Sequence, residues 1–128
     1  SMKFADKSPR DAFSDADWVC HLKIESSETL DEHEHRQGMN DVRYGVQHLE
    51  VFKKPSPIDE LPAEVYGSTV GGPVLEEGKE YLLCGSLLND VKLSCVAGQV
   101  KPEDVKQFVA EWDQISEEFI EEMKTFDQ

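Results

Sequence analysis

The side chains best suited to chemistry in this sequence are three cysteines, Cys20, Cys84 and Cys95. A cysteine nucleophile needs a thiolate held beside a base in an accessible, electropositive pocket. Cys20 and Cys84 instead lie on the apolar sides of predicted strands, and His21 faces away from Cys20 because strand neighbours point to opposite sides. We therefore predict buried thiols, while one disulfide, from Cys84 to Cys95 or from Cys20 to either, stays open as an alternative.

The second cluster is the pair His33 and His35, which alternates with acidic residues from Asp31 to Glu34. Imidazoles and carboxylates are metal ligands, but alternate spacing in an extended segment is poor for chelation, and a solvated loop explains the run more simply. The two histidines are therefore only weak metal candidates. Gly71-Gly72 lacks the flanking motif of a phosphate-binding loop. We predict that the chain is not an enzyme and has no cofactor.

The composition limits the partners. The chain has 128 residues, the length of one domain, and its 13 Lys and Arg stand against 27 Asp and Glu, a formal charge of -14. Proteins bind nucleic acid largely through Lys and Arg side chains on the phosphates. A chain this acidic is therefore not expected to bind nucleic acid. No apolar run approaches the roughly 20 residues needed to cross a bilayer. We expect a single domain over 1–128, a protein partner, and no membrane insertion.

The alternation of apolar and polar residues predicts most of the strands. A half-buried strand is expected from Asp17 to Glu25, and its inward side carries Trp18, Cys20, Leu22 and Ile24. Ser26 to Asp41 is polar and reads as a long exposed loop. Val42 to Lys53 is predicted as the second strand. Val65-Tyr66 is a short third strand, followed by a glycine-rich loop from Ser68.

A hairpin and a helical segment complete the expected fold. Glu80–Ser86 and Val91–Val96 are predicted to pair around Asn89-Asp90, which would place Cys84 across from Cys95. From Pro102 the period becomes helical, with a break expected between Trp112 and Ser116. The apolar stripe of this segment, residues 102–125, should dock on the sheet through Val105, Phe108, Trp112, Phe119 and Ile120. Residues 1–11 are expected to be flexible.

Strands first and helices last predict an α+β, mainly β domain, built as a small twisted sheet or barrel with helices packed on it. The stretch Ala12-Phe13-Ser14-Asp15-Ala16-Asp17-Trp18-Val19 resembles the first strand of the tissue inhibitors of metalloproteinases (TIMPs), a family of netrin-like domains. Further segments resemble later elements of that family in the same order: Tyr44 to Lys53, Val65 to Gly72, Gly78 to Gly85, and Trp112 to Ser116. Phe52 to Pro55 and Leu61-Pro62 look closest to secreted nematode TIMP-like proteins. The resemblance implies a five-stranded OB-like barrel with flanking C-terminal helices, secretion, and a protein partner.

The resemblance fails where the family does its chemistry. In the family, an N-terminal Cys-x-Cys places a free amino group and a carbonyl on the catalytic zinc of the protease, and disulfides tie that terminus to the barrel. Here Met2 and Phe4 stand near those two positions, Ser14 stands at a third cysteine, and Gly71 replaces a partner cysteine. Only Cys95 matches a family cysteine. A terminus without the cross-link must be ordered on binding, which costs affinity.

We therefore expect a secreted, monomeric interaction module that lacks strong zinc-chelating metalloproteinase inhibition. The alternatives are a working metalloproteinase inhibitor that uses the same edge, and a thiol- or metal-dependent enzyme. By the resemblance, the partner is a metalloproteinase or a host or other extracellular protein. The expected partner-binding edge forms a ridge with the loop around Leu30 to Met39 and consists of Lys3, Phe4, Ser68, Thr69, Val70 and Gly71.

Overall fold

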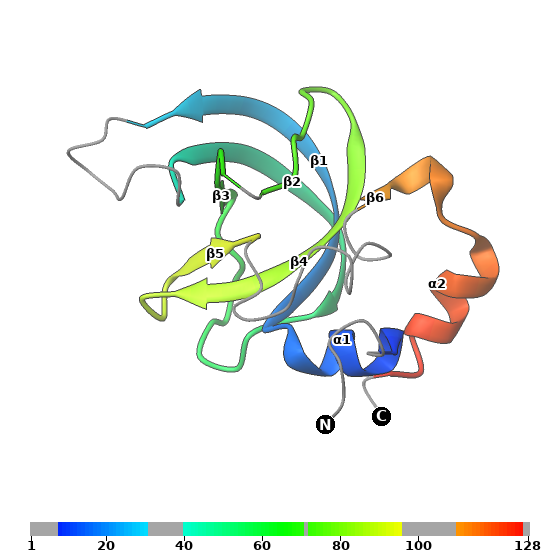
Figure 1. Ribbon diagram of the computed structural model, residues 1–128. Coiled ribbons are helices and arrows are strands. Elements are labelled where there is room, and N and C mark those ends of the chain that lie inside the picture. The colour runs from blue at the N-terminus through cyan, green and yellow to red at the C-terminus, as the bar shows by residue number, and fades with distance from the viewer. Residues whose placement is uncertain (1–7, 31–39, 71, 96–109, 127–128) are drawn as a thin grey trace.

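The computed structural model describes residues 8–30, 40–70, 72–95 and 110–126. It contains two short α-helices, six strands and one 3-10 turn (Figure 1). In chain order these are α1 Pro9–Asp15, β1 Trp18–Thr29, β2 Val42–Lys53, β3 Glu64–Gly67, β4 Glu80–Leu88, β5 Lys92–Ser94, β6 Ala110–Glu111, the 3-10 turn Trp112–Gln114 and α2 Glu117–Met123.

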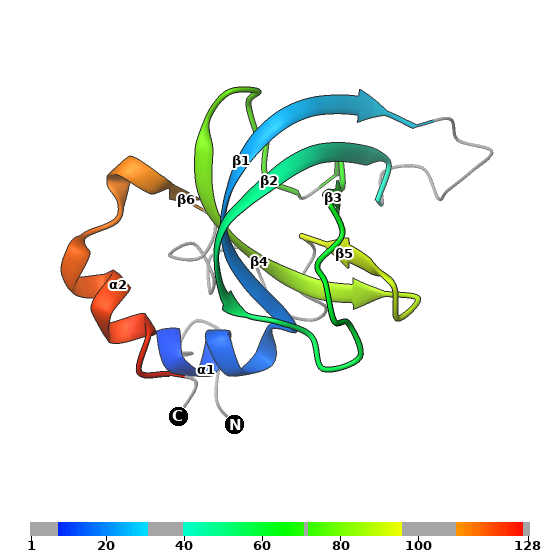
Figure 2. The ribbon, with the colours of Figure 1, turned by 180° about the vertical axis from the view of Figure 1, so that it is seen from behind.

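The first five strands form a closed barrel. Their order is β1-β2-β3-β5-β4, and β1 also pairs with β4, which joins the two ends of the sheet. The β3–β5 pairing is parallel and the others are antiparallel. The long, strongly bent β1 and β2 wrap around the barrel, as Figure 2 shows from behind. The prediction of an α+β, mainly β fold with a five-stranded OB-like barrel and flanking helices is confirmed.

The barrel interior is filled by alternate residues of the strands, as the period of two requires. On β1 the inward side is the predicted one, and Trp18, Cys20, Leu22 and Ile24 all have 0% exposure. On β4 the inward residues are Tyr81 and Leu83. Strand β5 adds Leu93, and Cys95 follows it.

A second apolar cluster, which we call the outer cluster, lies outside the barrel, between its wall and the helices. The wall supplies Val19 from β1 and Leu82 and Cys84 from β4, which alternate with the inward residues. Helix α1 begins with Ser8 as its N-cap and Pro9 in its first turn, and it buries Phe13 against this wall. Helix α2, capped by Ser116, contributes the fully buried Met123.

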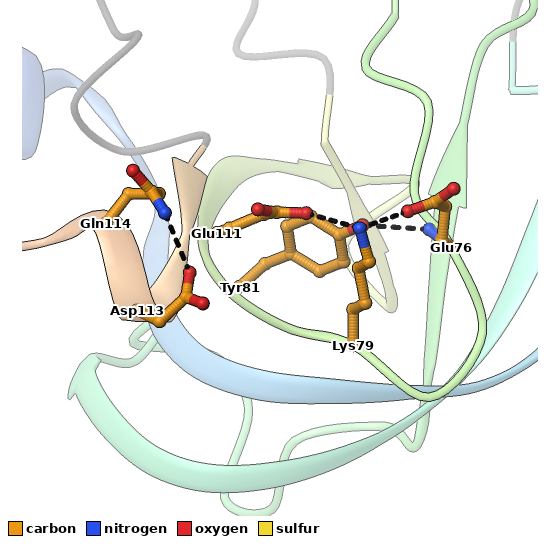
Figure 3. A network of polar contacts seen from close by, with 6 residues as sticks. All are labelled: Glu76, Lys79, Tyr81, Glu111, Asp113 and Gln114. Carbon is orange, nitrogen blue, oxygen red and sulfur yellow. Dashed lines mark hydrogen bonds and ion pairs between the residues drawn. The ribbon is translucent and has the colours of Figure 1, made fainter.

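Polar contacts, shown in Figure 3, and a ring stack hold β6 and the 3-10 turn to the barrel. Lys79 Nζ lies 2.5 Å from Glu76 Oε2 and 2.7 Å from Glu111 Oε1, so one ammonium joins the turn before β4 to β6. Beside it, His21 stacks on Trp112 with ring centroids 3.7 Å apart and planes 5° from parallel. The same imidazole places Nε2 2.6 Å from Glu80 Oε1.

Four details differ from the sequence-based prediction. Residues 9–11 belong to α1, because the buried Phe13 and the Ser8 cap fix a helix where a flexible segment is expected. Ser26 to Thr29 continue β1, because β2 pairs with them as far as Thr29 and Val42. Strand β6 was not predicted. The break before α2 is confirmed, whereas residues 102–109 of the predicted helical segment, with Val105 and Phe108, lie outside the described residues.

The fourth difference concerns the β4–β5 hairpin. Leu88 pairs with Lys92 and Ser86 with Ser94, so the turn has three residues and the register is shifted from the prediction. Asn89 and Asp90 adopt φ angles of 54° and 63°, a conformation that these two residue types tolerate. As a result Cys84 does not face Cys95: the Cys84 side chain belongs to the outer cluster and that of Cys95 to the barrel interior.

Candidate functional site

The three buried polar residues of the described chain gather at one end of the barrel. Asp41 is 7% exposed, Ser68 6% and Ser94 2%. Asp41 directly precedes β2, Ser68 directly follows β3, and Ser94 ends β5. Buried polar groups must be hydrogen-bonded to be tolerated, so their convergence marks a place that the fold organises specifically.

Hydrogen bonds join these residues to one another and to the loop after β3. Both Thr69 donors reach the Asp41 carboxylate: the backbone N–H at 2.8 Å to Oδ1, and the hydroxyl at 2.6 Å to Oδ2. The Asn40 N–H donates to Ser68 Oγ at 2.8 Å. The Ser94 hydroxyl donates to Asn40 Oδ1, also at 2.8 Å. We call these five residues, Asn40, Asp41, Ser68, Thr69 and Ser94, the edge network.

Backbone pairing places the edge network. Leu30 N–H donates to the Asp41 carbonyl at 2.8 Å, which closes the ladder of β1 and β2 just before β2 begins. Asn40 has a φ of 54°, which turns the chain into β2. Cys95 N–H donates to the Tyr66 carbonyl at 2.8 Å, and this bond extends the parallel pairing of β3 and β5 toward the same end.

The loop that the edge network holds carries an exposed apolar side chain. Val70 is 75% exposed, and Val74, on the far side of the same loop, is 88% exposed. Between them the chain turns back on itself at Gly72, where a Cβ atom would stand 2.3 Å from the Ser68 carbonyl oxygen. Only glycine fits so close to the backbone. The loop therefore has a hydrogen-bonded base and exposes Val70 and Val74 to solvent.

Three of the predicted edge residues, Ser68, Thr69 and Val70, lie together in this loop beside Asn40 and Asp41. Lys3, Phe4 and Gly71, and the ridge expected from residues 31–39, lie outside the described residues, as do the metal candidates His33 and His35. Their roles remain predictions. Sequence reasoning missed Asn40, Asp41 and Ser94, because a short polar residue beside a strand carries no signal of its distant partner.

The cysteines carry no disulfide. All three are free and buried, Cys20 and Cys95 in the barrel interior and Cys84 in the outer cluster. Burial raises the pKa of each of the three thiols to about 12. At Cys84 a smaller electrostatic contribution from Cys95 acts in the same direction. Thiols with such pKa values stay protonated at neutral pH and are poor nucleophiles.

The described part of the chain has neither a metal-binding cluster nor a helix that could span a membrane. No three His, Cys, Asp or Glu side chains there come close enough to bind a metal ion together. None of the described helices combines the length and the apolar character needed to span a bilayer.

The sequence matches a known family over nearly its whole length. The model of the family described as tissue inhibitor of metalloproteinase matches residues 4–124. The chain belongs to this family. A Caenorhabditis elegans relative named "Putative metalloproteinase inhibitor tag-225" is 35% identical over 136 residues, which covers 98% of this chain and 86% of the relative. The resemblance to TIMPs found in the sequence is thereby confirmed, and the closed barrel agrees with it.

Proposed function

We propose that this TIMP-family chain is a secreted protein-interaction module that recognises its partner through the edge network and the loop Ser68–Val70, without strong zinc-chelating inhibition of metalloproteinases. The observation that carries the proposal is the convergence of the three buried polar residues, Asp41, Ser68 and Ser94, beneath an exposed loop. A loop held in one conformation before binding loses less entropy when the partner arrives.

Two internal positions support weak inhibition. By the resemblance, Ser14 stands at a family cysteine, and Gly71 stands at the cysteine whose cross-link ties the inhibitory terminus to the barrel. Neither residue can form a disulfide, and all three cysteines of this chain are free. An unlinked terminus must be ordered on binding, and this lowers the affinity for the catalytic zinc. The protonated thiols likewise support a binding protein over an enzyme.

The second candidate is a working metalloproteinase inhibitor, favoured by the name of the nematode relative. A dose series against the catalytic domains of several matrix metalloproteinases separates the two, using protein with its native processed N-terminus. We expect weak or no inhibition. Inhibition at nanomolar concentration would contradict the proposal and favour the inhibitor.

Secretion is tested separately. The full-length coding sequence, expressed in cultured animal cells with a C-terminal tag, should yield protein in the medium. Retention of all the tagged protein inside the cells, beside a secreted control, would contradict this part of the proposal.

A further inference from the structure

Asp41 occupies an unusual position for a carboxylate. It is 93% buried by side-chain and backbone neighbours at the end of the barrel, where an unpaired charge would be costly. Both of its oxygens accept hydrogen bonds from Thr69, one from the backbone amide and one from the hydroxyl. Hydrogen bonds to an ionised acceptor are about twice as strong as those between neutral groups. The carboxylate therefore fixes both the backbone and the rotamer of the residue just before Val70.

The neighbouring bonds act on the same loop from the other side. Asn40 N–H donates to Ser68 Oγ, and Asn40 Oδ1 accepts from the buried hydroxyl of Ser94. Ser68 and Thr69 are thus each bonded to the chain just before β2, across 28 residues of sequence. The side chain of Val70 takes no part in these bonds and stays 75% exposed.

We propose that Asp41 is a positioning residue of the interaction edge: it holds the loop Ser68–Val70 in the conformation that presents Val70 to a protein partner. The proposal deepens the proposed function and rests on it for the identity of the edge. It adds that hydrogen bonds, and no disulfide, hold the loop. Cys95 lies nearby, but its thiol is free and its hydrogen bond goes to the Tyr66 carbonyl. The order of the loop should therefore be independent of reducing agents.

The test compares wild-type protein with Asp41→Asn by NMR, without any partner. Rigid backbone has an amide order parameter of about 0.85 and flexible backbone one below about 0.6. In Asp41→Asn we expect the order parameter of the Val70 amide to fall from the rigid to the flexible range. Amide exchange at Thr69 should become at least about tenfold faster, while the exchange of Leu22 and Leu82 in the barrel stays unchanged.

Two variants provide matched comparisons. Thr69→Val removes the hydroxyl bond but keeps the amide bond to Asp41, so the order parameter of its Val70 amide should fall between those of wild type and Asp41→Asn. If Asp41→Asn does not fold, Thr69→Val takes its place in the test. Val70→Ala changes the exposed tip and should leave Thr69 exchange unchanged. Dithiothreitol should leave the wild-type values unchanged.

Equal Thr69 exchange in wild type, Asp41→Asn and Thr69→Val would overturn the positioning role. So would a reductant-induced loss of order at Val70. Neither result depends on whether a metalloproteinase is inhibited, so failure of this proposal is distinguishable from failure of the proposed function.

Discussion

Gly85 lies where β4 passes close to the end of β5. A Cβ atom at this position would stand 1.7 Å from the Ser94 carbonyl oxygen and 2.9 Å from the Cys95 Cα. Both contacts are with backbone, which cannot move without disturbing the strand that carries Ser94 to the edge network. Gly85 is thus a steric requirement of the barrel.

We predict that Gly85→Ala lowers the free energy of unfolding by about 3 kcal/mol, since two backbone segments must move apart. Gly78→Ala is the comparison. Apart from its two chain neighbours, no atom of the described residues lies within 4 Å of the Gly78 Cβ position, but its φ of 87° disfavours alanine, so a loss of about 1 kcal/mol is expected. Urea unfolding measures both. An equal or larger loss in Gly78→Ala would contradict the close approach at Gly85.

The three thiols predict a loss of stability in alkali. Burial raises the pKa of each to about 12 in the folded state, whereas in the unfolded chain a thiol ionises near 9. The stabilising effect is therefore complete below pH 9 and is lost as the pH rises toward 12. Between pH 9 and pH 10, each thiol should lower the free energy of unfolding by about 1 kcal/mol.

Urea midpoints at pH 8, 9 and 10 measure this dependence. Cys20→Ala removes one thiol and should make the decline shallower by about a third, whatever its absolute stability. An unchanged slope in Cys20→Ala would mean that the Cys20 thiol ionises alike in both states.

Among the elements, α2 depends on one residue more than the sequence suggests. Met123 belongs to the same apolar stripe as the predicted docking residues Phe119 and Ile120. It is the helix residue with 0% exposure, while Phe119 is only partly buried. Met123 packs in the outer cluster with residues of α1, β1 and β4. The helix is thus anchored near its C-terminal end.

We predict that Met123→Ala costs about 3 kcal/mol and Phe119→Ala about half as much, because the cost of truncation follows burial. Urea midpoints of the two variants test the order. A larger loss in Phe119→Ala would place Phe119 in the core and contradict the packing of α2.

At the scale of the whole molecule, stability comes from the barrel and its two apolar clusters, with no covalent cross-link. A native disulfide in a small domain typically contributes about 2 to 5 kcal/mol. We therefore predict that millimolar dithiothreitol leaves the melting temperature unchanged. A clear decrease, absent in a variant with all three cysteines replaced by alanine, would reveal a disulfide and contradict the structure.

Local pattern by itself located the first five strands and the break before α2. The period of two on β1 identified the inward side of Trp18, Cys20 and Leu22, because alternation is a property of the strand alone. The range of β2 was likewise exact. The order and spacing of short motifs in the sequence also predicted the family to which the chain belongs.

Tertiary structure decided what joins distant parts of the chain. The β1–β4 pairing closes the barrel, and the three-residue turn before β5 sets a register that separates Cys84 from Cys95. The edge network joins Asp41 to Thr69 across 28 residues and Ser94 to Asn40 across 54. In the sequence, a short polar residue such as Asp41 predicts only a loop. Its hydrogen-bond partner becomes known only when the fold buries it beside a distant segment of the chain.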